Sequence, residues 1–146
     1  MNYARLALAA VAATVFDALY GFLVYGMLLA PEFAKYPGVY RANDAGQAFL
    51  PLMFAGLFVA IAAAAIIYAK GYEGGSGIGE GIRFGVLLGL FVVFAFYGVN
   101  YATLIINRKL AVMTAAAGFV EWTAIGAVIG LVYKPAAAPR LRAAAV

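Results

Sequence analysis

The stretch "GIGEGIRFGVLLGL" at residues 77–90 carries the packing signal of this chain. Its glycines at positions 77, 81, 85 and 89 recur every four residues, which places them along one face of a helix. Membrane helices associate through close backbone contact at small residues, because lipid solvates large apolar side chains as well as protein does. The stretch therefore predicts a membrane helix whose Gly81, Gly85 and Gly89 face a partner helix.

Two other apolar segments repeat the same spacing of small residues. One contains Gly56, Ala60 and Ala64, and the other contains Gly126 and Gly130. Both segments are predicted to be packing partners for the glycine face of residues 77–90. Either these faces only close one helix bundle, or one of them joins two copies of the chain in a homodimer.

The composition is that of a membrane protein. Of the 146 residues, 67% are hydrophobic and 11% are charged, whereas soluble domains have about 25% charged residues. A bilayer core about 30 Å thick requires about 20 apolar residues per helix. The chain is therefore predicted to be all-α and polytopic, with one four-helix transmembrane domain over residues 1–134 and a flexible tail at 135–146. The predicted spans are 6–30, 49–69, 80–106 and 110–133.

The orientation follows from the basic residues. An even number of spans places both termini and the middle loop on one side of the membrane. That side contains six basic residues, and the other contains four. Because basic residues favour the cytoplasmic side, the termini are predicted to be cytoplasmic. The six are Arg5, Lys70, Arg83, Lys134, Arg140 and Arg142; the four are Lys35, Arg41, Arg108 and Lys109.

Several function classes are disfavoured by residue types that the chain lacks. It contains no cysteine and no histidine, so the usual ligands of zinc, copper and haem iron and the commonest general base are missing. No cofactor and no metal site is predicted. The basic residues stand singly at helix ends rather than in a patch, so nucleic acid is not an expected partner. The expected partner is the lipid bilayer.

Two acidic residues are the strongest candidates for chemistry. Asp17 and Glu121 fall near the middle of the first and fourth spans. An ionised acid at that depth costs about 2.5 to 3.5 kcal/mol on insertion scales, so such residues face inward or are protonated. If they share a cavity, they would tend to hold one proton between them, which suits proton coupling. Alternatively, each acid only joins helices by hydrogen bonds to Tyr20, Thr14, Thr123 or Trp122.

Other polar residues of the spans are secondary candidates. Asn100 follows Gly89 by eleven residues, close to three turns of an α-helix, so it is predicted to face the bundle interior. Tyrosines in the same half of the membrane line a polar vestibule or form an aromatic belt. They are Tyr20, Tyr25, Tyr97 and Tyr101. Arg83 is interpreted either as a snorkelling anchor or as an anionic headgroup site.

Four motifs resemble those of small bacterial four-helix membrane families known as domains of unknown function 1761 and 2177. They are "FDALYGFLVYG" at 16–26, "GIRFGVLLGL" at 81–90, "VNYATL" at 99–104 and "EWTAIGAVIGLVYK" at 121–134. Asp17 and Asn100 match residues of one family, and Glu121 stands where that family has aspartate. The resemblance implies a four-helix fold in a bacterial inner membrane and assigns no reaction.

Three functions are compatible with these features. The first is binding or proton-coupled transport of a small molecule by the midplane carboxyls, for which a single narrow four-helix bundle would need to dimerise. The second is an accessory or assembly subunit of a larger membrane complex. The third is an enzyme acting on lipid or quinone with the two acids as acid and base, which the absence of histidine, cysteine and cofactor motifs makes the least favoured.

Overall fold

The structure is a computed structural model that describes residues 1–41 and 46–133. Within these residues every element of regular secondary structure is a helix. Four helical stretches are long and apolar enough to cross a membrane. The predicted tail at 135–146 lies outside the described residues. The four stretches are Tyr3–Leu28, Leu50–Gly71, Gly77–Thr103 and Arg108–Val132.

The first and third stretches each change helix type along their length. Helix α1 (Tyr3–Gly21) continues into the π-helical segment η1 (Phe22–Leu28), and the short helix α2 (Ala30–Phe33) follows. Helix α5 (Gly77–Val92) likewise continues into the π-helical segment η2 (Val93–Gly98) and then α6 (Val99–Thr103). Helices α4 (Leu50–Gly71) and α7 (Arg108–Val132) are α-helical throughout.

Polar caps begin three of the long helices. The side chain of Asn107 accepts a hydrogen bond from the Leu110 amide at 2.9 Å at the start of α7. Ser76 caps α5 and Asn2 caps α1 in the same way. Each cap satisfies one of the amides that a helix leaves unpaired in its first turn. Ser76 and Asn107 therefore mark where α5 and α7 begin in a chain that is otherwise mostly apolar.

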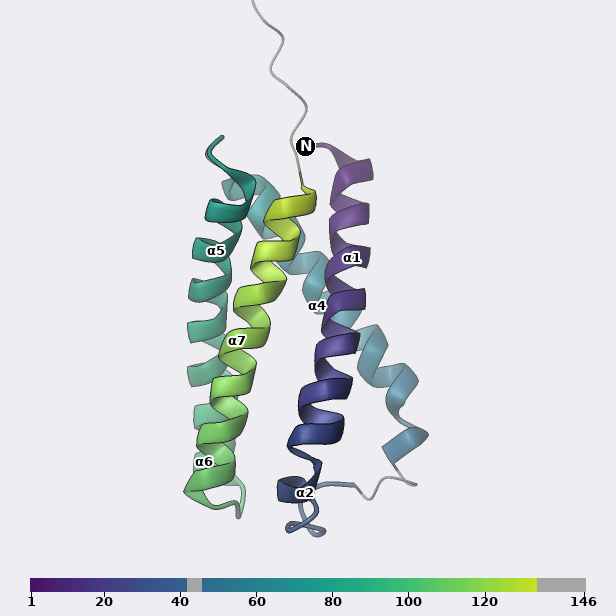
Figure 1. The fold of residues 1–146 in the computed structure, drawn as a ribbon, viewed down its shortest axis with the longest axis vertical. Helices are drawn as coiled ribbons and strands as arrows, with labels where there is room; N and C mark the ends of the chain where they lie inside the picture. Colours follow the sequence, from purple (N-terminus) through teal and green to yellow (C-terminus); the bar gives the residue numbers. More distant parts are fainter. Residues whose placement is uncertain (42–45, 134–146) are drawn as a thin grey trace, which may run out of the picture.

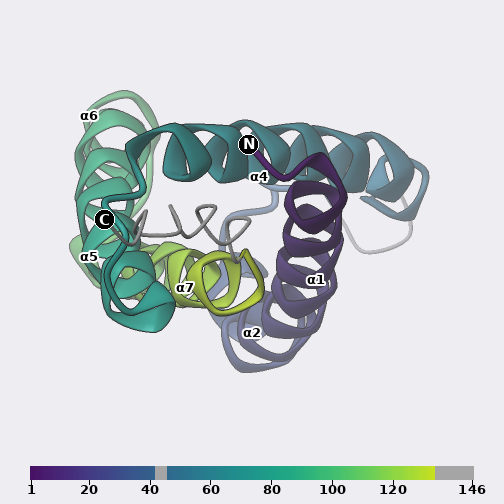
Figure 2. The same ribbon diagram turned by 90° about the horizontal axis from the view of Figure 1, so that it is seen from above.

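Helix α7 lies between α5 and α1, and α4 crosses behind them (Figure 1). Seen from above, α4 runs along one side of the other long helices and extends past α1 (Figure 2). The apolar core lies at the end of the molecule that carries the N-terminus, where α1, α4 and α7 meet. Its fully buried members include Ala9, Ala13, Ile61, Ala65, Ile125 and Ile129.

The glycines of α5 lie directly against the backbone of α7. A Cβ atom added at Gly85 would stand 2.5 Å from the Thr123 carbonyl oxygen and 2.8 Å from the Thr123 Cα. At Gly77 and Gly81 it would overlap the carbonyl groups of Gly130 and Gly126, respectively. The predicted contact between the glycine faces of the third and fourth stretches is therefore present.

The predicted role of Gly56 and Ala60 in this packing is wrong. Gly56 has no atom of another residue within 4 Å of its Cβ position, and Ala60 is exposed. Helix α4 instead packs through its second half, where Ile61, Ala64 and Ala65 are buried. Its first half diverges from the other helices (Figure 2), so the small residues there meet no partner helix in the described part of the chain.

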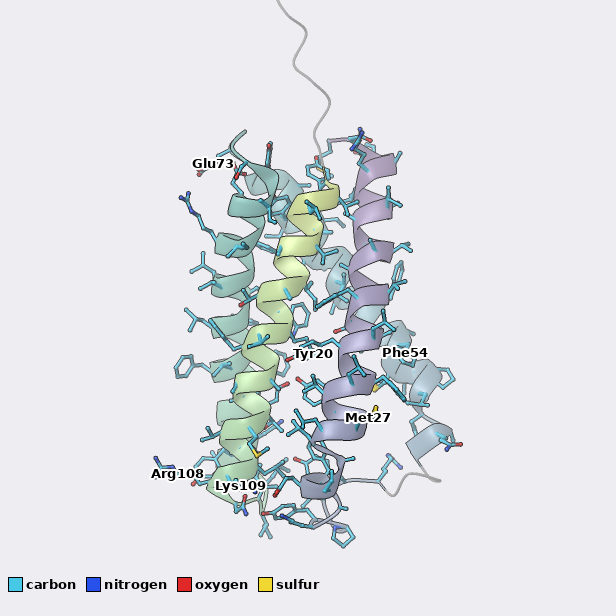
Figure 3. The ribbon with its side chains drawn as sticks, in the orientation of Figure 1. Tyr20, Met27, Phe54, Glu73, Arg108 and Lys109 are labelled. Carbon is cyan, nitrogen blue, oxygen red and sulfur yellow. The ribbon has the colours of Figure 1, made fainter. Side chains whose placement is uncertain are left out.

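A polar clasp fastens the segment after η1 to the turn before α7. The Glu32 carboxylate pairs with Lys109 at 2.6 Å and with Lys35 at 2.8 Å. The Tyr36 hydroxyl accepts a hydrogen bond from the Asn107 amide at 3.1 Å. The hydrogen bonds from Lys109 and Lys35 hold the pKa of the Glu32 carboxyl below its usual value of 4.5. Arg108 and Lys109 mark this end of α7 in Figure 3.

Candidate functional site

The two predicted acids come together between α1 and α7. Asp17 exposes 2% of its surface and Glu121 exposes 7%. Their carboxyl groups lie close enough to interact with each other. Among the described residues no lysine or arginine forms an ion pair with either of them, since both salt bridges there belong to Glu32. The geometry is thus that of a buried carboxyl pair without a counter-ion in the described part of the chain.

Three tyrosines converge on the single turn of α7 that carries Glu121. The Tyr25 hydroxyl donates to Glu121 Oε2 at 2.9 Å and lies 3.2 Å from the Tyr97 hydroxyl. The Tyr20 hydroxyl donates to the Ala117 carbonyl at 2.9 Å. Figure 3 shows Tyr20 between α1 and α7. Side chains from both long stretches that flank α7 therefore form one polar network around the acids, which we call the carboxyl–tyrosine network.

The two π-helical segments supply the tyrosine that donates to Glu121 and the tyrosine whose hydroxyl lies beside it. Tyr25 lies in η1 and Tyr97 lies in η2. π-Helical turns are rare, are frequent at functional sites, and contain an extra residue per turn. One extra residue rotates everything that follows by about 100° relative to a continuous α-helix. The sequence carries no simple signal for this change of register, and the network depends on it at two positions.

The register change also corrects the prediction for Asn100. An uninterrupted α-helix would place Asn100 above Gly89, but η2 lies between them and turns Asn100 away from α7. Asn100 is exposed, so its predicted position in the bundle interior is wrong. Tyr101 follows on the same short helix and is 49% exposed, outside the carboxyl–tyrosine network.

The hydrogen-bond partners proposed for the acids differ from those observed. Thr14 donates to the Ala10 carbonyl of its own helix at 2.8 Å. Trp122 is half-buried and packs against the apolar core. The Thr123 hydroxyl and Asp17 Oδ1 are both buried and have no hydrogen-bond partner within residues 1–41 and 46–133. A buried carboxyl oxygen without a hydrogen-bond partner costs free energy. Protonation of Asp17 Oδ1, or a hydrogen bond to it from a bound molecule, would remove this cost.

Gly118 is a member of the site that sequence reasoning missed. A Cβ atom at this position would lie 2.7 Å from the Tyr97 hydroxyl and would overlap its ring. The available signal was a lone glycine within a helix, which costs about 1 kcal/mol relative to alanine and usually has a packing reason. Here the reason is room for the Tyr97 ring one turn before Glu121.

Replacing Gly118 with alanine is expected to displace the Tyr97 ring and to break its contact with the Tyr25 hydroxyl. Because the displaced group is a side chain rather than backbone, the protein should still fold, with a destabilisation of about 1 to 2 kcal/mol. Thermal unfolding in detergent and tyrosine ultraviolet spectra measure the two effects. The matched control is Gly56→Ala, which enters open space. Identical tyrosine spectra for Gly118→Ala and wild type would contradict the assigned packing.

A cavity of about 880 Å³ lies beside the network, between η1, the segment after it and the start of α4. This volume lies within the roughly 300 to 1,000 Å³ of small-molecule sites. Tyr25 lines the cavity and also hydrogen-bonds Glu121, so it connects the cavity to the acids. The Arg41 guanidinium lies 3.8 Å from the centre of the Phe49 ring on the cavity wall. The other lining residues are Gly26, Ala30, Phe33, Ala34, Pro37, Tyr40, Gly46, Gln47, Leu50 and Met53.

The described residues contain no cluster of three or more acidic side chains that could hold a metal ion. Comparisons of the chain with protein-family models, with curated proteins and with solved structures found no match. The resemblance to the two families of unknown function therefore stays a prediction.

Proposed function

We propose that this chain is an integral membrane protein that binds or transports a small molecule, with Asp17 and Glu121 as its proton site. The observation that carries the proposal is the position of Tyr25, which lines the cavity and donates to Glu121. A molecule that enters the cavity and disturbs Tyr25 would change the hydrogen bonding of Glu121. Protonation of the acid pair and occupancy of the cavity would then be coupled.

The charge balance of the pair supports this assignment. Two ionised carboxylates in contact, within a membrane span and without a nearby cation, would repel each other and lose their hydration. A single shared proton removes the repulsion and provides a donor for the contact between the carboxyls. Asp17 Oδ1 remains available as an acceptor. A site with one mobile proton and one free acceptor suits proton exchange better than a fully satisfied structural contact.

Carbodiimide labelling tests this function, because carbodiimides react with protonated carboxyl groups in apolar surroundings. N,N′-Dicyclohexylcarbodiimide is expected to modify Glu121 or Asp17, located by mass spectrometry, with less modification as the pH rises. The matched control is the clasp carboxyl Glu32, which is paired with two lysines and should stay unmodified. Absence of modification at both acids between about pH 5 and pH 9 would show a sealed structural contact and would sink the proposal.

The proposed location is a bacterial inner membrane, with both termini on the cytoplasmic side. The basis is the sequence count of six basic residues against four. The chain lacks cysteine, so single cysteines at Gly38 and Gly71 are unique labels, and both positions have open space for a side chain. In intact cells a membrane-impermeant maleimide is expected to label Gly38→Cys and to spare Gly71→Cys. The reverse pattern would invert the orientation, and labelling of both would exclude the four-span topology.

A second candidate function is supported by helix α4. From Pro51 to Ala60 every residue except Leu57 is exposed, so this half of the helix has no partner helix among the described residues. An accessory subunit could dock on another membrane protein along it, and a homodimer could use the same surface. Purification from native membranes in a mild detergent distinguishes the cases, because an accessory subunit would be recovered with one stoichiometric partner.

A further inference from the structure

A second cavity lies at the opposite end of the molecule, at the turn between α4 and α5. Its volume is about 280 Å³, just below the range of about 300 to 1,000 Å³ for sites that enclose a small molecule. It therefore has room for a polar headgroup rather than for a whole ligand. It is lined by Ile67, Tyr68, Gly71, Glu73, Glu80, Arg83, Phe84 and Leu87.

Among the residues that the structure describes, Arg83 is the only cation that lines this cavity. The carboxylate of Glu80, its nearest acidic neighbour in the sequence, already accepts hydrogen bonds from two backbone amides. One Glu80 carboxylate oxygen accepts from the Gly75 amide, and the other accepts from the Glu73 amide at 3.2 Å. Within residues 1–41 and 46–133 Arg83 has no ion-pair partner. Its guanidinium therefore lacks the carboxylate that an interfacial arginine often finds on its own helix.

The remaining walls give the cavity two chemically different sides. Leu87 follows Arg83 by four residues and lies one turn further along the same helix face. Together with Ile67 and Phe84 it forms an apolar wall toward the middle of the span. Glu73 stands at the outer edge of the α4–α5 turn (Figure 3) and is exposed. An acid at the outer edge, then a cation, then an apolar wall match an amphiphile with a zwitterionic head.

We propose that this cavity binds the headgroup of an amine-bearing phospholipid such as phosphatidylethanolamine. The phosphate would bind the Arg83 guanidinium, whose planar fork matches phosphate oxygens. The ammonium would lie beside the Glu73 carboxylate, and an acyl chain would follow Leu87. The inference rests on the proposed insertion of the chain in a membrane. It is independent of the carboxyl–tyrosine network in the middle of α7.

A simple snorkelling arginine would behave differently. It would hold its charge at the interface and attract anionic lipids without distinguishing their headgroups. The acids on the cavity wall instead disfavour a headgroup with net negative charge. The proposed site is therefore distinguished by its preference for ethanolamine over glycerol headgroups, and Glu73 is the residue that sets this preference.

Native mass spectrometry of the full chain, released from equimolar phosphatidylethanolamine and phosphatidylglycerol, tests the site. Wild type is expected to retain one phosphatidylethanolamine, and Arg83→Gln to reduce this retention about tenfold, as for loss of a bidentate phosphate contact. Arg5→Gln is the matched control, because Arg5 is exposed at the same end of the bundle but lines neither cavity. Glu73→Gln should fold normally and shift retention toward phosphatidylglycerol.

Equal losses in Arg83→Gln and Arg5→Gln, or a lipid preference unchanged in Glu73→Gln, would overturn the proposal. Displacement of the lipid by an equal concentration of inorganic phosphate would show that the ligand is a free phosphate compound rather than a lipid. Alkaline carbonate extraction of every variant shows whether it is inserted in the membrane, so loss of lipid binding is distinguished from loss of insertion. Extraction of wild type into the supernatant would refute the membrane location itself.

Discussion

Leucine in place of Gly85 is expected to force α5 away from α7 and to destabilise the protein by about 3 kcal/mol or more. The value is the upper end of the usual cost of overpacking. It applies because the obstacle is backbone: the Cβ position lies 2.5 Å from the Thr123 carbonyl oxygen. Backbone cannot change rotamer, so the two helices must separate and lose their contact along the glycine face.

A series of single Gly→Ala variants distinguishes this backbone clash from any effect that is common to replacing a helical glycine. The cost should be largest at Gly85, smaller at Gly89, where the Cβ position is 3.0 Å from the Phe119 carbonyl oxygen, and absent at Gly56, which faces open space. Thermal unfolding in detergent measures the series. Equal changes in melting temperature at all three positions would contradict the backbone contact between α5 and α7.

Replacing Glu121 with leucine is expected to destabilise the protein by about 1 to 3 kcal/mol, whereas glutamine should preserve the fold. Leucine removes the acceptor of the Tyr25 hydroxyl, which lies 2.9 Å from Glu121 Oε2, and leaves this half-buried donor with only the Tyr97 hydroxyl at 3.2 Å. Glutamine keeps a carbonyl acceptor at that position but cannot release a proton. The corresponding pair at the other acid is Asp17→Leu and Asp17→Asn.

These variants distinguish a structural contact from a proton site. If the acids only join helices, the two amide variants should retain both the fold and any pH-dependent behaviour of the wild type. If they exchange protons, the amide variants should fold and lose that pH dependence. Unfolding of the amide variants to the same extent as the leucine variants would show that the amide cannot replace the carboxyl even as a hydrogen-bond acceptor.

The sequence was sufficient to predict the four apolar helices, because membrane spans need only length and hydropathy. It also predicted the contact of Gly81 and Gly85 with the fourth stretch, because a four-residue spacing specifies a helix face. The same rule failed at Gly56 and Ala60. A spacing shows which residues share a face, but whether a partner helix lies against that face depends on how α4 crosses the others.

The site was predicted less completely than the fold. The depth of Asp17 and Glu121 in their spans was enough to single them out, since acids in apolar spans are costly. The prediction for Asn100 failed because it assumed a regular α-helix from Gly89 onward, and η2 interrupts it. Nothing in the local residue pattern marks a π-helical turn. The contribution of Gly118 was likewise hidden, because its role depends on Tyr97 from another helix.

The most direct test of the account is infrared difference spectroscopy of the carboxyl groups in lipid nanodiscs, between about pH 4 and pH 9. If Asp17 and Glu121 share one proton, the wild type should show a protonated-carboxyl carbonyl band at neutral pH. This band should be absent from the Asp17→Asn, Glu121→Gln double variant. The band should also shift in deuterated water, because the shared proton exchanges with bulk water. A wild-type spectrum with both carboxylates ionised at neutral pH and no protonated carbonyl band would contradict the account.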